Sequence, residues 1–381
     1  MLLRRKGLLI SALCLLYGIS SAQRSYAPQS VLASGNWFKI AISEAGVYRM
    51  DIPFLNSLGI NTSNLASSSI RLFGNGGQPL SEANAGPWID DLAENAIFIE
   101  DGGDGILNGS DYILFFAPGP HRWVKDSINS RFTHQKNLYS ERSYYFISIG
   151  ASGRRMALSP LLTSPSATVN SFSGRYFHEL DTVNFLSSGK EWYGEEFADM
   201  PGRTLLRHFT IPLTNIIAGS SLQVRSQVVA RSIGSGCQFQ VLINNNQAGQ
   251  VPLLPVGAGI YDLFAREALS QFSAPAAANN TVSFQFSPGS VNAQGWLNWF
   301  EVFIRQQLSM AGVNQLLFRD WQSVGNNSAE FRIAQAPSTM QVWDVTDPRS
   351  PLRMQGSVAG NEFRFVNDCS RLREYVAFNP G

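Results

Sequence analysis

The feature that most restricts the possible folds of this chain is a series of apolar runs of strand length, separated by turns. The turns between them are rich in Gly, Asn, Ser and Pro, and no long Ala/Glu/Lys/Leu stretch is present. Evenly spaced runs of this kind are typical of a β-sandwich of jelly-roll type. In the second half of the chain they lie at residues 204–213, 221–232, 237–243, 281–287 and 297–307. We therefore predict a mainly β protein with a jelly-roll-like β-sandwich over residues 171–310.

The residues before the sandwich predict a small β-rich N-terminal domain over residues 30–155. Asp51 to Leu58 offers an Asp cap, an early Pro and helical spacing, which indicates one short helix closed by Gly59. Candidate strands flank it within residues 36–50, 69–73, 96–99, 112–117 and 142–149. The Ser-, Thr- and Pro-rich residues 156–170 are predicted to form a linker, and residues 311–381 a further β segment of short strands.

The first 22 residues have the pattern of a secretory signal peptide. Arg4, Arg5 and Lys6 precede an apolar run from Leu8 to Tyr17, and Ser20–Ala22 offers small residues for cleavage. A membrane anchor is the alternative, but a spanning helix needs about 20 apolar residues. We expect secretion across the inner membrane, to the periplasm or the cell surface, with no other transmembrane segment.

The net charge gives no reason to expect either a nucleic-acid partner or an anionic membrane. The net charge is +1, and removing the three basic residues of the leader makes it −2. A near-neutral chain has no electrostatic attraction to a polyanion.

Two cysteines remain after the leader, Cys237 and Cys369. They form either one disulfide or two buried thiols, and their separation does not decide between these. Neither lies in the context of a catalytic nucleophile. No two His or Cys residues have zinc-ligand spacing, and the four histidines are His121, His134, His178 and His208.

The loop from Glu100 to Asp111 is the candidate metal site. Oxygen donors recur along it as in a calcium loop, with Gly105 at the sharp turn. The loop resembles that of dockerins, although Gly102 offers no side-chain oxygen. An acidic, Gly-rich hairpin without metal is the alternative. The predicted calcium ligands are Glu100, Asp104, the Ile106 carbonyl, Asn108 and Asp111.

A second cluster combines carboxylates and aromatic rings. Glu191, Glu195 and Glu196 could be mistaken for a glycosidase pair, but an exposed loop with its aromatic residues packed onto the sandwich explains them better. The alternative function that they suggest is a secreted carbohydrate-binding or adhesin-like sandwich. Its sugar platform would comprise Trp192, Tyr193, Trp296 and Trp299.

Four ordered stretches resemble one family. They are Gly35–Met50 (GNWFKIAISEAGVYRM), the Asp/Gly loop through Gly119–Trp123 (GPHRW), Gly295–Val302 (GWLNWFEV) and Val342–Pro348 (VWDVTDP). They are similar to the N-terminal part of the PorU family, the gingipain-like sortases of the type IX secretion system in Bacteroidetes.

The resemblance implies a protein on the outer-membrane surface that works with other type IX secretion components. The family cleaves cargo C-terminal signals with a Cys–His dyad whose His precedes Gly. The four histidines here precede Arg, Gln, Glu and Phe. We therefore expect a non-catalytic scaffold that docks to a downstream catalytic domain and to surface partners, without a catalytic residue of its own.

Overall fold

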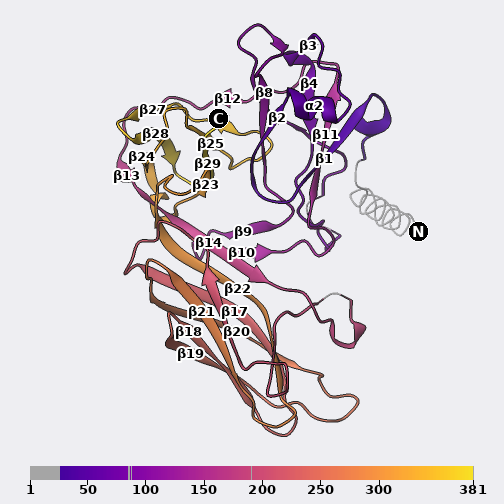
Figure 1. The fold of residues 1–381 in the computed structure, drawn as a ribbon, viewed down its shortest axis with the longest axis vertical. Helices are drawn as coiled ribbons and strands as arrows, with labels where there is room; N and C mark the ends of the chain where they lie inside the picture. The colour runs from indigo at the N-terminus through magenta and orange to yellow at the C-terminus, as the bar shows by residue number, and fades with distance from the viewer. Residues whose placement is uncertain (1–25, 85, 87, 190, 381) are drawn as a thin grey trace, which may run out of the picture.

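The chain is mainly β, as the sequence predicts. The computed structural model describes residues 26–84, 86, 88–189 and 191–380. The predicted signal peptide, residues 1–22, lies outside the described residues. Figure 1 shows two parts: an upper part that contains both described ends, and an elongated lower part.

The N-terminal domain packs two larger antiparallel sheets around an apolar core, and strands β3 and β7 pair as a further two-stranded sheet. The strand orders of the two larger sheets are β1-β11-β4-β5 and β2-β8-β6. The short helix α2 (Ile52–Ser57) forms as predicted. The Asp51 carboxylate caps it by accepting a hydrogen bond from the Phe54 backbone amide at 2.9 Å. The core includes Ile70, Leu72, Ile113, Phe115 and Ile147. The strands are β1 (Trp37–Ile42), β2 (Gly46–Asp51), β3 (Leu65–Ala66), β4 (Ile70–Phe73), β5 (Glu94–Asn95), β6 (Phe98–Glu100), β7 (Ile106–Leu107), β8 (Tyr112–Ala117) and β11 (Ser143–Ile149), with 3-10 turns at Val31–Ala33 and Ser67–Ser69.

One hairpin of this domain reaches the lower part of the molecule. Strands β9 (Arg122–Asp126) and β10 (Arg131–Gln135) pair with each other as a two-stranded sheet. In Figure 1 they lie across the strands at the top of the sandwich.

The β-sandwich packs two sheets, ordered β14-β22-β17-β20 and β16-β21-β18-β19. Alternation along β18 (Cys237–Ile243) points Phe239 and Val241 into the core, where Phe284 and Phe300 meet them. The other strands are β14 (Ser171–Glu179), β15 (Glu196–Ala198), β16 (Leu206–Ile211), β17 (Ser221–Arg231), β19 (Asn246–Leu253), β20 (Arg266–Pro275), β21 (Asn280–Ser287) and β22 (Gln294–Gln307), with a 3-10 turn at Phe185–Ser187.

The C-terminal strands form two further sheets, ordered β13-β24-β28-β27 and β12-β26-β25-β29-β23. The segment predicted as a linker contributes two of these strands, β12 (Ala157–Leu158) and β13 (Ala167–Val169), each pairing in parallel with a later strand. The others are β23 (Gln315–Phe318), β24 (Asn326–Ala334), β25 (Gln341–Asp344), β26 (Leu352–Arg353), β27 (Gly356–Ala359), β28 (Glu362–Cys369) and β29 (Tyr375–Phe378), with a 3-10 turn at Trp321–Ser323.

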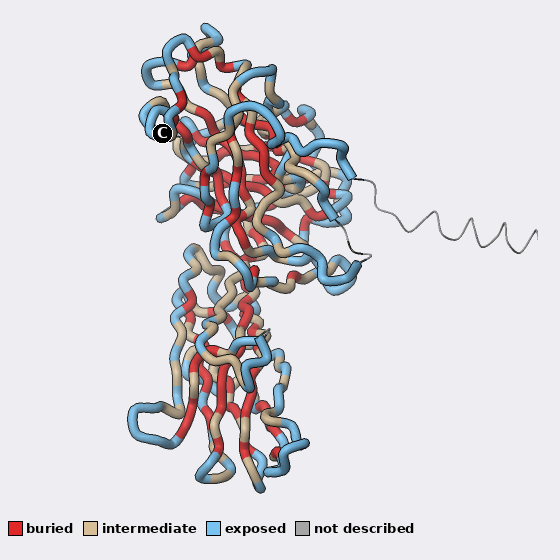
Figure 2. The backbone as a smooth tube through the Cα atoms, turned by 90° about the vertical axis from the view of Figure 1, so that its right-hand side faces the viewer, coloured by how far each residue is buried: buried red, intermediate tan, exposed pale blue. Residues whose placement is uncertain are grey.

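The two ends of the chain share a core. Val47 and Phe116 of the N-terminal domain pack with Trp343, Val376 and Phe378 of the C-terminal sheet. The indole of Trp343 is fully buried and meets the Phe378 ring edge-on, with centroids 4.9 Å apart. Figure 2 shows buried backbone running continuously through the upper part. The N-terminal domain and the C-terminal strands therefore form one packed unit.

Candidate functional site

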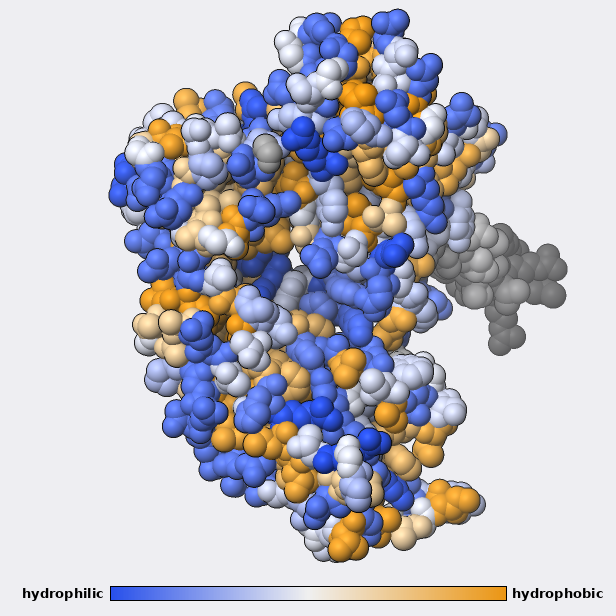
Figure 3. Space-filling view, viewed as in Figure 1, coloured by the Kyte–Doolittle hydropathy of each residue, from blue (hydrophilic) through white to orange (hydrophobic). Residues whose placement is uncertain are grey.

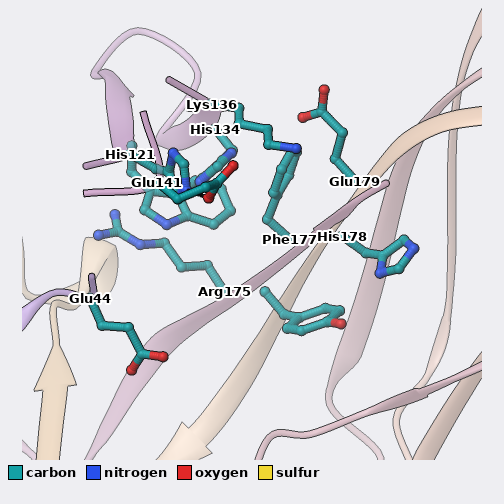
Figure 4. A pocket seen from close by; sticks show the side chains of 11 residues that line it. Glu44, His121, His134, Lys136, Glu141, Arg175, Phe177, His178 and Glu179 are labelled. Carbon is teal, nitrogen blue, oxygen red and sulfur yellow. Dashed lines mark hydrogen bonds and ion pairs between the residues drawn. The ribbon is translucent and has the colours of Figure 1, made fainter. Parts of the chain in front are cut away.

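A cavity lies where hairpin β9–β10 meets strand β14 of the sandwich. Its volume is about 650 Å³. Figure 3 shows the surface hollowed at the height of the hairpin, and Figure 4 shows the lining side chains. The lining combines rings with charged groups: Glu44, His121, Trp123, His134, Lys136, Glu141, Arg175, Tyr176, Phe177, His178 and Glu179.

His134 anchors the hairpin to the sandwich. Its ring stacks on Phe177 of β14, with centroids 3.6 Å apart and planes at 26°, and Trp123 meets it edge-on at 5.0 Å. Burial is the main cause that lowers the pKa of His134 to about 3, and the charges of His121, Arg175 and Lys136 contribute to this shift. The imidazole is therefore neutral at physiological pH and serves as a flat packing surface.

A buried ion pair between Arg225 and Glu301 of the sandwich also holds the hairpin in place. The backbone amide of His134 donates to one oxygen of Glu301 at 2.6 Å, and Arg225 donates to the other at 2.7 Å. Only 1% of the Glu301 side chain is exposed. Burial raises the pKa of Glu301, while the His134 amide and the Arg225 charge lower it. Glu301 thus joins two strands of the sandwich to the hairpin.

A second cluster of charged groups joins the sandwich to the C-terminal strands. Glu374 accepts from Arg175 at 3.0 Å and lies 3.4 Å from Arg319. Burial lowers the pKa of both guanidinium groups, and the Glu374 charge opposes this effect. The Arg175 guanidinium also lies over the Phe132 ring at 4.2 Å. Three distant segments of the chain therefore meet at Arg175.

Carboxylates and one lysine border the cavity. Lys136 pairs with Asp181 at 2.7 Å. Burial is the main cause that raises the pKa of Glu179 to about 7; the charges of Asp181 and Glu191 contribute to this rise, and the charge of Lys136 opposes it. Figure 4 places Lys136 and Glu179 on the same side of the cavity. Glu179 titrates near neutral pH at the junction between the hairpin and the sandwich.

These contacts join parts of the chain rather than present reactive groups. The charged groups at the centre of the junction are paired with groups from other segments, and the rings fill the space between them. Such an arrangement holds domains in a fixed orientation. It also leaves a polar, open-sided cavity at the joint.

The predicted calcium loop lies at the surface of the N-terminal domain. Asn108 donates through its amide to Asp104 at 3.1 Å and to the Ile106 carbonyl at 3.2 Å, so three of the five predicted ligands converge. Asp111 instead accepts from the Asn108 backbone at 2.8 Å, and Glu100 ends β6 as an exposed residue. No group of three or more His, Cys, Asp or Glu residues with metal-binding geometry occurs in the part of the chain that the structure describes. Calcium binding stays a prediction.

The predicted sugar platform is not a continuous surface. Trp296 is buried, with its ring edge against Phe185, and Tyr193 stacks on the other side of this Phe185 ring. Trp299 donates its indole N–H to Gln227 at 3.0 Å. Trp192 remains exposed. Tyr193 and Trp296 therefore pack the loop that carries Phe185 on the sandwich.

The three carboxylates near this platform have separate partners. Glu191 accepts from the Asn298 amide at 2.9 Å, and Glu195 is buried and pairs with His178 at 2.7 Å. Glu196 pairs with Arg203 at 2.8 Å. None of the three forms the open carboxylate pair of a glycosidase.

Both cysteines are free, buried thiols in different cores. Cys237 lies in the sandwich core and Cys369 in the core of the C-terminal strands. Burial raises the pKa of Cys237 to about 11 and also raises that of Cys369. Neither thiol is near a histidine in the cavity, because His121, His134 and His178 line the cavity and neither cysteine does. The fourth, His208, bonds Ser283 at 2.7 Å.

Sequence reasoning did not single out the residues of the junction. Arg175, Glu301 and Glu374 are the main ones, and they pair with groups far away in the sequence. A charged residue inside an otherwise apolar strand, such as Glu301 in β22, is the only local signal they leave.

Comparison with solved structures identifies a protein with a similar fold. The chain is similar to dimeric latent PorU from Porphyromonas gingivalis, with a TM-score of 0.77 and 22% identity over 94% of this chain and 33% of that one. The chain has the fold of a PorU region. It spans about a third of the length of the PorU chain that it matches.

Other comparisons add little to the PorU match. A CBM36-1 domain of a xylanase from the hindgut metagenome of Trinervitermes trinervoides has a TM-score of 0.23 and 7% identity over 34% of this chain and 96% of that one. BuGH86 in complex with neoagarooctaose has a TM-score of 0.21 and 11% identity over 71% and 32%. These scores are too low to indicate a shared fold. No family model and no curated protein matches the sequence.

Proposed function

We propose that this chain is a non-catalytic scaffold region of a type IX secretion surface sortase. The PorU-related fold, which extends over 94% of the chain, is the observation that supports the proposal most. The buried junction between the N-terminal domain, the sandwich and the C-terminal strands suits a rigid scaffold. Its role is to hold a peptidase domain in position relative to its partners.

The chemistry of the cysteines supports a non-catalytic role. A nucleophilic cysteine needs an accessible thiolate, stabilised by a nearby cation or helix N-terminus. Cys237 and Cys369 are buried and have raised pKa values instead. Their surroundings favour the neutral thiol.

A peptidase assay tests this role. The purified chain should not cleave peptides that span a cargo C-terminal signal, with or without reductant. Thiol-dependent turnover that disappears in Cys237→Ala would contradict the proposal. Cys369→Ala is the matched control, because it removes a buried thiol from the other core.

The proposed partners are a downstream catalytic domain and other type IX secretion components at the cell surface. The proposed location is the outer-membrane surface, after export across the inner membrane. Within the described residues no helix is both long and apolar enough to cross a bilayer. Protease accessibility of intact cells that express the tagged chain tests the location, because a periplasmic protein would be protected.

We also propose that the Asp/Gly loop binds calcium. The amide of Asn108 already occupies the point where Asp104 and the Ile106 carbonyl converge. Rotation of this amide by 180° would present its oxygen to a cation at that point. Calcium titration followed by calorimetry should show binding that Asp104→Asn weakens, whereas Asp90→Asn, outside the loop, serves as the control. No heat at millimolar calcium would leave the loop as a hairpin without metal.

A further inference from the structure

The far end of the sandwich carries exposed apolar side chains. Ile260 and Tyr261 are 91% and 99% exposed in the loop of residues 254–265 between β19 and β20. Leu263 in the same loop is 60% exposed, and Val291 in the neighbouring loop between β21 and β22 is fully exposed. In Figure 1 these loops form the lower end of the molecule, away from both described ends. Figure 3 shows hydrophobic residues at this end.

The shape of the loop keeps these side chains pointing outward. Asp262 accepts a hydrogen bond from the Gly259 amide at 2.7 Å and donates its own amide to the Gly259 carbonyl. A Cβ atom at Gly257 would lie 2.0 Å from the Asp262 carboxylate, so a larger residue there would displace this carboxylate from the turn. The residues between the two ends of this turn, Ile260 and Tyr261, form its tip.

The loops at this end are held together as one surface. Val256 donates its amide to the Ser232 carbonyl at 2.9 Å, and Ile233 donates its amide to Asn292 at 3.0 Å. The segment at Ser232 and Ile233 thus bridges the two loops that carry Tyr261 and Val291. The apolar side chains are parts of one end face.

Two arginines lie at the base of the loop. Arg231 donates to the Phe264 carbonyl at 2.6 Å and stacks over the Phe264 ring at 4.4 Å. Arg266 donates to the Pro255 carbonyl at 3.2 Å. Each of these contacts uses part of a guanidinium group that has five N–H donors. Cationic groups therefore lie behind the apolar tip.

We propose that this end of the sandwich inserts into the lipid–water interface of a membrane. The apolar side chains at the tip would face the acyl chains, and the tyrosine among them suits the lipid–water interface. The arginines behind the tip would lie at the level of the anionic headgroups. The apolar residues project from two loops instead of lining a groove, and a lipid surface needs no matching pockets. This inference does not depend on the proposed secretion role.

Vesicle binding tests the inference on the full chain. Phosphatidylcholine vesicles, with and without phosphatidylglycerol, should sediment the protein, and phosphatidylglycerol should strengthen binding through the two arginines. The combined variant I260S/Y261S/L263S should lose at least about a hundredfold in partitioning, because burying each such side chain favours binding by roughly tenfold.

The matched control is Ile128→Ser in the turn of hairpin β9–β10, where Ile128 is 95% exposed. It should bind vesicles like the unchanged chain. The melting temperature of the triple variant should not change, because its side chains make no core contact. Tyr261→Trp supplies a second readout, since its emission should shift to the blue when vesicles are added.

Three results would overturn the inference. The first is no sedimentation of the unchanged chain with either vesicle, and the second is equal binding by the triple variant. The third is a dimer in solution that the triple variant abolishes, with no vesicle binding, which would assign the surface to a second copy of the chain.

Discussion

Replacing Glu179 with glutamine should stabilise the protein at alkaline pH and leave it nearly unchanged at acid pH. Glu179 lines the cavity, and the nearby charges of Asp181, Glu191 and the cation Lys136 act on its carboxylate. Lys136 is already paired with Asp181. Ionised Glu179 is therefore a partly buried charge beside other negative charges, and the amide of a glutamine would remove it.

The magnitude follows from the pKa of Glu179, which burial raises to about 7. A free glutamate has a pKa of about 4.3, and each pH unit of difference corresponds to about 1.4 kcal/mol. Because the folded-state pKa is the higher one, stability is greatest below about pH 4 and falls as pH rises to about 7. Solvent at the cavity reduces the ideal value, so we expect roughly 1–3 kcal/mol from Glu179→Gln at pH 8.

Urea unfolding at pH 5 and pH 8, followed by tryptophan fluorescence, measures this effect. Trp123 lies in the hairpin beside His134 and reports on the junction. Glu141→Gln is the control, because its side chain is 74% exposed. The reasoning fails if Glu179→Gln changes the free energy of unfolding equally at both pH values, or destabilises the protein at pH 8.

Three further predictions concern the buried groups. Glu301→Leu should cost about 3–5 kcal/mol because it leaves Arg225 buried without its partner, and adding Arg225→Met should recover much of this loss in urea unfolding. Trp343→Ala should cost about 3–5 kcal/mol and speed proteolysis between the N-terminal domain and the C-terminal strands; unchanged proteolysis would contradict the shared core. Cys237 and Cys369 should react with a thiol reagent in urea but not in the folded protein, and rapid labelling without urea would show that a core opens.

The sequence predicts the helices and strands whose formation depends on neighbouring residues. The Asp51 cap and early proline place helix α2 within one residue of its observed end, and strict alternation gives β18 its observed bounds. The sequence does not mark the bounds of strand β14, because Arg175 and other polar residues interrupt its apolar pattern. These polar residues face the hairpin and the C-terminal strands, which cover them.

The junction could not be predicted, because its contacts join residues far apart in the sequence. Glu301 bonds an amide 167 residues earlier, and Arg175 pairs with Glu374, 199 residues later. No spacing within one segment encodes such pairs. The burial of Trp296 has a similar cause, because the loop that carries Phe185 folds over it.

Strand β29 lies between β25 and β23, and its four residues are all buried. It covers the apolar face that Val47 and Phe116 present from the other end of the sequence. During synthesis that face stays open to water until β29 has followed, so the N-terminal domain cannot be completed before this strand emerges. A chaperone that guards exposed apolar surface would have most to do here, and deleting this strand would damage a domain far from it in the sequence.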